Sequence, residues 1–493
     1  MRASRPWLTL GVMSAGLFLA VMSTTVVSVA LPTMGRDLHA SPAGLEWIVD
    51  AYVIVYASLL VAGGAAGDRY GRKGLFQLGT AIFGLGSLAS GLAPAVGVLL
   101  AARVLQGIGP ALLVPGSLTI LRATFTDARP RAVAIGLWST ASGLALALGP
   151  PVGGLLVDGP GWRWVFLINV PLAALLVLAA ARWVQRLPRG AGAADRFDWT
   201  GAGLVTFALA ALAFGTIEGP ARGWGAPVVV AAFAAGAAGL AGFVAVERHQ
   251  ARPLIDVALF QKPAFTAAGV AAAGVFFAFV GLIVYLSAYF QQVQGHSAVR
   301  AGLDVASVGV SYALAASWSG RLAGRIGERG PLIAGLVIAG AATLGLLRLT
   351  PGTPLSGIWW NFALLGGGMG LCGTPISSIA MSAVDVPRAG MASAVINSLR
   401  QVGQVFGVAV LGALVYARLP GGAAGARLGP AQALAFTAGL HAALWACGLV
   451  LLAVAIVVAG LSATVRRLPD STLRRSPCGT RSGLTRLRAS RPR

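Results

Sequence analysis

Long apolar stretches separated by short polar segments recur along the whole chain. A helix needs about 20 mainly apolar residues to cross a bilayer core of about 30 Å. Fourteen stretches are close to that length or longer, at residues 8–30, 44–66, 75–93, 97–121, 132–156, 164–184, 200–217, 226–246, 265–290, 298–318, 331–349, 356–382, 391–416 and 434–462. The first follows two arginines, but it is longer than the apolar core of a signal peptide and begins a series of similar stretches. The pattern therefore predicts an all-α polytopic membrane protein.

Composition excludes a soluble protein. Among the 493 residues, 57% are hydrophobic and only 11% are charged, whereas soluble domains carry about 25% charged residues. The net charge of +22 first resembles that of a nucleic-acid binder, but apolar runs separate the arginines, so we expect no nucleic acid. Three widely spaced cysteines and an unclustered His441 predict neither a disulfide framework nor a metal or other cofactor.

The distribution of basic residues predicts the topology. An even number of spans places both termini on one side, and 28 of the 37 Lys and Arg residues lie on that side, with seven on the other. Because cytoplasmic loops carry the excess of Lys and Arg, both termini are expected in the cytoplasm of a bacterium, with the chain in its cell membrane. The basic tail 466–493 is expected to be disordered and to meet anionic lipid headgroups.

An internal repeat relates the two halves. Residues 64–73 (GAAGDRYGRK) align with 320–329 (GRLAGRIGER) at an offset of 256, with three identical positions. Both copies lie in predicted cytoplasmic loops, so the repeat is parallel. They stand eight spans apart rather than six, which predicts a 6+2+6 arrangement. The expected parts are a first bundle (1–190), two inserted helices with linkers (191–262), a second bundle (263–465) and the tail.

Three motifs carry candidate chemistry. The first is a tight charged loop whose ion pairs could lock one conformation, with ordinary positive-inside anchoring as the alternative: Gly64, Asp68, Arg69, Gly71, Arg72 and Lys73. The second is an arginine inside a span, which is functional by default unless it snorkels to the interface: Arg103, with Gln106 and Gly107. The third combines close helix contact with a bend, as a seal or hinge or as plain packing: Gly136, Gly149, Pro150, Gly153 and Gly154.

Together these motifs resemble the major facilitator superfamily, and in particular its 14-helix drug:proton antiporter branch. Segments 22–32, 162–171 and 397–403 are similar to that branch as well. The resemblance implies two six-helix bundles that alternate access to a central cavity, driven by protons and without ATP. One position departs from the pattern: the branch usually carries an aspartate where this chain has Ser23.

The departure at Ser23 directs attention to other intramembrane carboxylates. Asp50 and Asp304 lie within spans, and Glu46 lies nearer the interface. Asp50 is preferred, since residues 47–52 resemble the same segment in exporters of cationic antiseptics. Its depth along the helix matches the depths of Arg103 and Ser23, so all three could share one layer. Arg103 could then switch the proton affinity of Asp50. The alternative is that Asp50 and Asp304 only link helices structurally, through fixed interactions with Arg103 and Arg400.

Several further side chains are candidates for lining a cavity. Aromatic rings beside an acid suit a lipophilic cation, although such rings more often face lipid or pack the bundle. The candidates are Ser23, Thr25, Tyr52, Tyr285, Tyr289 and Arg400.

The sequence therefore predicts proton-coupled efflux of small hydrophobic, including cationic, drugs or antiseptics. The alternative is a dedicated exporter of one natural product, as in antibiotic self-resistance. An enzyme is not expected, because HExxH, GxSxG and Walker motifs are absent from the sequence.

Overall fold

A computed structural model describes residues 6–186, 198–250, 255–384, 389–419 and 427–467. Within them the chain is helical, and the described residues contain no strand. The first-half helices are α1 (Pro6–Asp37), α2 (Pro42–Tyr70), α3 (Arg72–Gly91), α4 (Val96–Thr124), α5 (Ala128–Asp158), α6 (Trp164–Leu167) and α7 (Asn169–Trp183). The remaining long helices are α8 (Trp199–Arg222), α9 (Pro227–His249), α10 (Pro263–Ala288), α11 (Ala298–Ile326), α12 (Arg329–Gly345), α13 (Trp359–Ser382), α14 (Ala389–Tyr416) and α15 (Pro430–Arg467). Short turns η1 (Val257–Gln261), η2 (Tyr289–Val293), η3 (Leu346–Arg348) and η4 (Leu355–Gly357) connect some of them.

The helices confirm the predicted membrane architecture. With α6 and α7 as one segment, fourteen crossings are present in the described residues, and thirteen are long and apolar enough to span a bilayer. The exception is α3, whose glycines let it pack closely on α4. A Cβ on Gly79 would lie 2.6 Å from Gly109 O, and one on Gly86 2.6 Å from Gln106 Cα.

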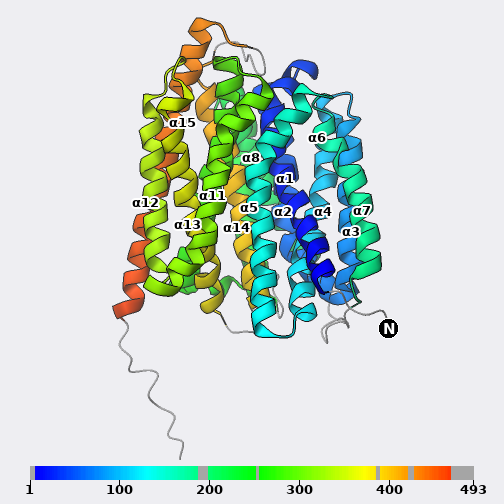
Figure 1. Ribbon diagram of the computed structural model, residues 1–493. Coiled ribbons are helices and arrows are strands. Elements are labelled where there is room, and N and C mark those ends of the chain that lie inside the picture. The colour runs from blue at the N-terminus through cyan, green and yellow to red at the C-terminus, as the bar shows by residue number, and fades with distance from the viewer. Residues whose placement is uncertain (1–5, 187–197, 251–254, 385–388, 420–426, 468–493) are drawn as a thin grey trace, which may run out of the picture.

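The start of α1 and the end of α15 lie at the same end of the molecule (Figure 1). We name this end the terminal face and the opposite end the distal face. Which face meets the cytoplasm stays a prediction from the basic residues.

The repeat predicted from sequence has the same geometry in both copies. Gly71 ends α2 with φ 101°, and Gly327 ends α11 with φ 83°. Their N–H groups donate to Gly67 O at 3.1 Å and Ala323 O at 2.9 Å. Residues with a Cβ rarely adopt such φ values, so each glycine permits the same sharp turn into the next helix.

Helices from the two halves meet mainly along two contacts. α5 packs along α11, and α2 packs along α14. The inserted helix α8 packs on both α2 and α14, while α9 packs mainly on α8. The linkers at 187–197 and 251–254 and the tail from residue 468 lie outside the described residues, so the boundaries of the parts stay a prediction.

Candidate functional site

Arg103 on α4 is the centre of a buried polar cluster. Its side chain is fully buried, so the snorkelling interpretation is wrong. Nε donates to Ile48 O at 2.8 Å, and Nη1 donates to Gln106 Oε1 at 2.6 Å and to Ser23 Oγ at 3.4 Å. The guanidinium lies 4.3 Å from the centre of the Tyr52 ring, a cation–π contact. Neutral groups from α1, α2 and α4 therefore stabilise the guanidinium charge.

The other two residues of the Arg103 motif, Gln106 and Gly107, support this cluster. Gln106 Nε2 donates to Ser87 Oγ at 2.7 Å and to Ser23 Oγ at 3.3 Å. Gly107 lets α4 approach α2, because a Cβ there would lie 2.5 Å from Tyr52 O. The Tyr52 hydroxyl donates to Ala20 O at 2.8 Å. Ser23 and Tyr52 thus belong to the Arg103 cluster.

Asp50 on α2 is fully buried, and neither of its carboxylate oxygens has a hydrogen-bond partner in the structure. The expected partnership with Arg103 is not seen, since no ion pair joins these two described residues. Asp50 and Tyr52 are two positions apart, which is about 200° around a helix. Since the Tyr52 ring contacts Arg103, Asp50 points to another face of α2.

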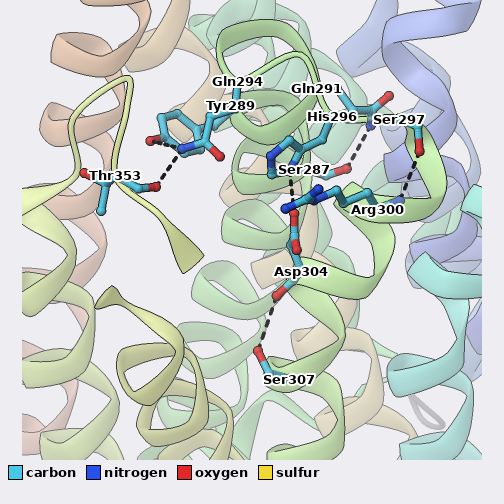
Figure 2. Close-up of polar contacts among 10 residues, drawn as sticks. All are labelled: Ser287, Tyr289, Gln291, Gln294, His296, Ser297, Arg300, Asp304, Ser307 and Thr353. Atoms are coloured by element: carbon cyan, nitrogen blue, oxygen red, sulfur yellow. Dashed lines mark hydrogen bonds and ion pairs between the residues drawn. The ribbon is translucent and has the colours of Figure 1, made fainter. Parts of the chain in front are cut away.

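Asp304 on α11 lies near the distal face and is paired with a histidine. Its Oδ2 is 2.6 Å from His296 Nδ1 (Figure 2). The imidazole stacks on the Phe290 ring with 5.7 Å between the ring centres. Arg400 instead contacts Ser377 Oγ and Asn397 Oδ1, at 3.0 and 3.3 Å. The alternative in which Arg103 and Arg400 tie Asp50 and Asp304 is therefore wrong.

Two further cavity candidates have packing roles. The Tyr289 hydroxyl accepts from Gln294 Nε2 (Figure 2). It donates to Thr350 O at 2.5 Å, so this ring is anchored to the loop after α12. Thr25 lies in the α1–α5 contact, with its hydroxyl 3.5 Å from Ala145 O. Neither side chain lines the cavity described below.

The glycine and proline motif of α5 lies between two neighbouring helices. A Cβ on Gly153 would lie 2.6 Å from Val26 O of α1, and one on Gly154 would lie 2.5 Å from Ala298 O of α11. Gly149 is equally close to Thr25, and Gly302 of α11 packs on Pro150. Gly136 has nothing within 4 Å of a Cβ position. Gly154 and Pro150 therefore form the tight contact between the halves, whereas Gly149 and Gly153 pack on α1 within the first half.

The charged loop after α2 joins neighbouring helices at the terminal face. Lys73 Nζ donates to Val184 O at 2.6 Å and Ala181 O at 2.9 Å, at the end of α7. Gly64 lies close to Pro115 of α4, with 3.5 Å from its Cβ position to Pro115 Cβ. The Asp68 side chain lies outside the described residues, so its role with Arg69 and Arg72 as a lock stays a prediction.

A small cavity lies near the distal face where α1 and α2 meet α10, η2 and α14. Tyr285, a predicted lining residue, borders it, and its hydroxyl donates to Val408 O at 2.7 Å. Glu46, Gln292 and Tyr416 also border it. From the sequence, Glu46 was only an acid near the interface, and nothing indicated Gln292 or Tyr416, because contacts between distant helices bring them together. His296 was also missed, since it lies in the turn before α11, outside the apolar spans.

The fold and these buried charged residues define a polytopic membrane transporter. The chain belongs to the Major Facilitator Superfamily, whose family model matches residues 13–408. It is similar to a structure described as a bacterial homolog of the human lysosomal transporter Spinster, inward-facing and unoccupied, with a TM-score of 0.67 and 20% identity over 97% of this chain and 100% of that one. At that identity the likeness concerns the fold alone.

Curated relatives are bacterial resistance proteins. The multidrug resistance protein Stp of Mycobacterium tuberculosis is 36% identical over 84% of this chain and 76% of its own. The tetracenomycin C resistance and export protein of Streptomyces glaucescens is 34% identical over 84% and 77%. The methylenomycin A resistance protein of Bacillus subtilis is 35% identical over 82% and 86%. This chain is a multi-pass membrane protein of the superfamily.

Proposed function

We propose that this protein exports small hydrophobic molecules, including cationic drugs or antiseptics, across the bacterial cell membrane in exchange for protons. The observation that carries the proposal is Asp50, a fully buried carboxylate without a hydrogen-bond or ion-pair partner. An unpaired ionised carboxylate inside a membrane protein costs several kcal/mol. Such a residue is explained if Asp50 alternates between a protonated and an ionised state as the bundles move.

Each motif has a role in this mechanism of alternating access. Arg103 supplies a fixed positive charge in the first bundle, at the layer of Ser23, and Asp304, in contact with His296, is a second candidate for proton or cation coupling. The distal half of α5 seals the contact with α11, and the loop at 64–73 locks the terminal face. Protons, rather than ATP, drive export, and no enzymatic step is needed. The terminal face is cytoplasmic, where the tail 466–493 meets anionic lipids.

A second candidate is a dedicated exporter of one natural product. The printed names of relatives favour it, because two of them are resistance proteins for single antibiotics. A susceptibility panel of lipophilic cations, dyes and antibiotics in a pump-deficient host separates the two. Broad protection supports multidrug export, and protection against one compound class supports the dedicated exporter.

Proton coupling at Asp50 is tested in inverted vesicles under an imposed pH gradient. With ethidium and a quaternary ammonium antiseptic as probes, the parent should accumulate substrate and Asp50→Asn should lose most gradient-driven uptake. Asp127→Asn is the matched control, because Asp127 is an exposed carboxylate without a capping hydrogen bond. Full gradient-driven uptake of every parent substrate by Asp50→Asn would contradict the coupling role.

A further inference from the structure

Glu46 lies in the sealed contact between the two halves at the distal face. Its side chain is 5% exposed. The small cavity beside it is bordered by Leu31 of α1 and by Tyr285, Gln292 and Tyr416 of the second half, and it has room for about one water molecule. Gly412 of α14 lies directly against Glu46 Oε1 and the Tyr285 hydroxyl, since a Cβ there would overlap both. Separation of the halves at this face would therefore expose Glu46.

Among the described residues, none of the titratable groups that face Glu46 carries a positive charge. The titratable groups that face it are Asp50 on its own helix, Glu218 of α8, Tyr285 of α10 and Tyr416 of α14. Each of these is an acid or a neutral phenol. An ionised carboxylate in the closed contact would thus be buried without a counter-charge, which costs several kcal/mol.

The unpartnered polar atoms fit a protonated Glu46. Glu46 Oε2 and Gln292 Oε1 are both buried without a hydrogen-bond partner, and both border the same cavity. Two acceptors cannot satisfy each other, but a protonated carboxyl carries an O–H donor. One added proton lets Glu46 donate to Gln292, directly or through a single water, and it removes the charge as well.

We propose that Glu46 is a proton-binding residue of the distal seal. When the seal closes, Glu46 binds one proton from the solution at the distal face. When the seal opens, the carboxyl is exposed and exchanges this proton with the solution. Asp50 lies four positions further along α2, on the same face one turn deeper, so the bound proton moves from Glu46 to Asp50. The second step rests on the proposed function, in which Asp50 couples protons to export.

The inference is tested by measuring the opening of the distal face against pH. Spin labels are placed at two exposed positions, Arg36→Cys in the last turn of α1 and Ala417→Cys directly after α14, in a chain with Cys478→Ser. Pulsed electron spin resonance then reports the distance between the two halves. Because the closed state binds one more proton, raising the pH should lower the closed-to-open ratio by up to about tenfold per pH unit. Glu46→Gln, which imitates the protonated side chain, should remain closed without this shift.

Asp127→Asn is the control, since Asp127 is an exposed carboxylate without a capping hydrogen bond and is not among the groups that face Glu46. It should keep the parent's pH shift. A parent without a pH shift, or an equal shift in Glu46→Gln, would overturn the inference. If the inference fails in this way but Asp50→Asn still loses gradient-driven uptake, the proposed proton-coupled export stands. If instead the pH shift depends on Glu46 but the parent shows no gradient-driven uptake, the proposed function is overturned and the role of Glu46 in the seal stands.

Discussion

The contact between α5 and α11 allows a sharp test at Gly154. A Cβ at this position would lie 2.5 Å from Ala298 O and 2.6 Å from Val299 Cα, both backbone atoms that no rotamer change can remove. Real Cβ contacts are almost never below 3.0 Å, so Gly154→Ala should force the two helices apart by about 0.5 Å or more. Overpacking of this kind costs about 1–3 kcal/mol.

Gly136→Ala is the matched control in the same helix. Nothing lies within 4 Å of its Cβ position, and replacing a glycine by alanine inside a helix gains up to about 1 kcal/mol. In detergent, the melting temperature of Gly154→Ala should fall below that of the parent, while that of Gly136→Ala should be equal or higher. Efflux should fall only in Gly154→Ala. Equal melting temperatures for the two variants would refute the assignment of this contact as the seal.

Three further substitutions test other parts of the site. Arg103→Lys should abolish efflux and lower stability by about 1–3 kcal/mol, because one ammonium cannot reach all the acceptors that the guanidinium binds; thermal unfolding and vesicle transport measure both. Lys73→Gln removes a charged donor from the end of α7, where a positive charge interacts favourably with the helix dipole by about 0.3–1 kcal/mol. The melting temperature should therefore fall slightly. His296→Ala leaves Asp304 without its partner and should destabilise the protein by about 1–3 kcal/mol, more than Asp304→Asn, which keeps a hydrogen-bonding group; chemical denaturation distinguishes the two.

Features that depend on local pattern were predictable from the sequence. Apolar length alone located the crossings, and the repeat predicted that Gly71 and Gly327 occupy equivalent turns, since each needs a backbone conformation that other residues avoid. Arg103 was identified because a charge inside an apolar run requires partners. Depth along the helices also placed Ser23 and Arg103 in one layer, as their contact shows.

Features that depend on the rotation of helices were not predictable. Equal depth suggested that Asp50 and Arg103 are partners. Depth does not tell, however, whether Asp50 lies on the face of α2 that contacts Arg103. Tyr289 lies in an aromatic stretch, yet the loop after α12 holds its hydroxyl. Glu46 lies close to the start of its helix, and it is surrounded by α1 and by helices more than 160 residues away in sequence.

The central claim, exchange of substrate for protons through Asp50, is tested most directly by measuring proton movement itself. Purified protein in liposomes that contain a pH-sensitive dye is given an inward ethidium gradient without any imposed pH gradient. The account predicts that ethidium drives a proton flux in the opposite direction in the parent and that Asp50→Asn shows none. Ethidium movement without proton flux in the parent, or an unchanged flux in Asp50→Asn, would contradict it.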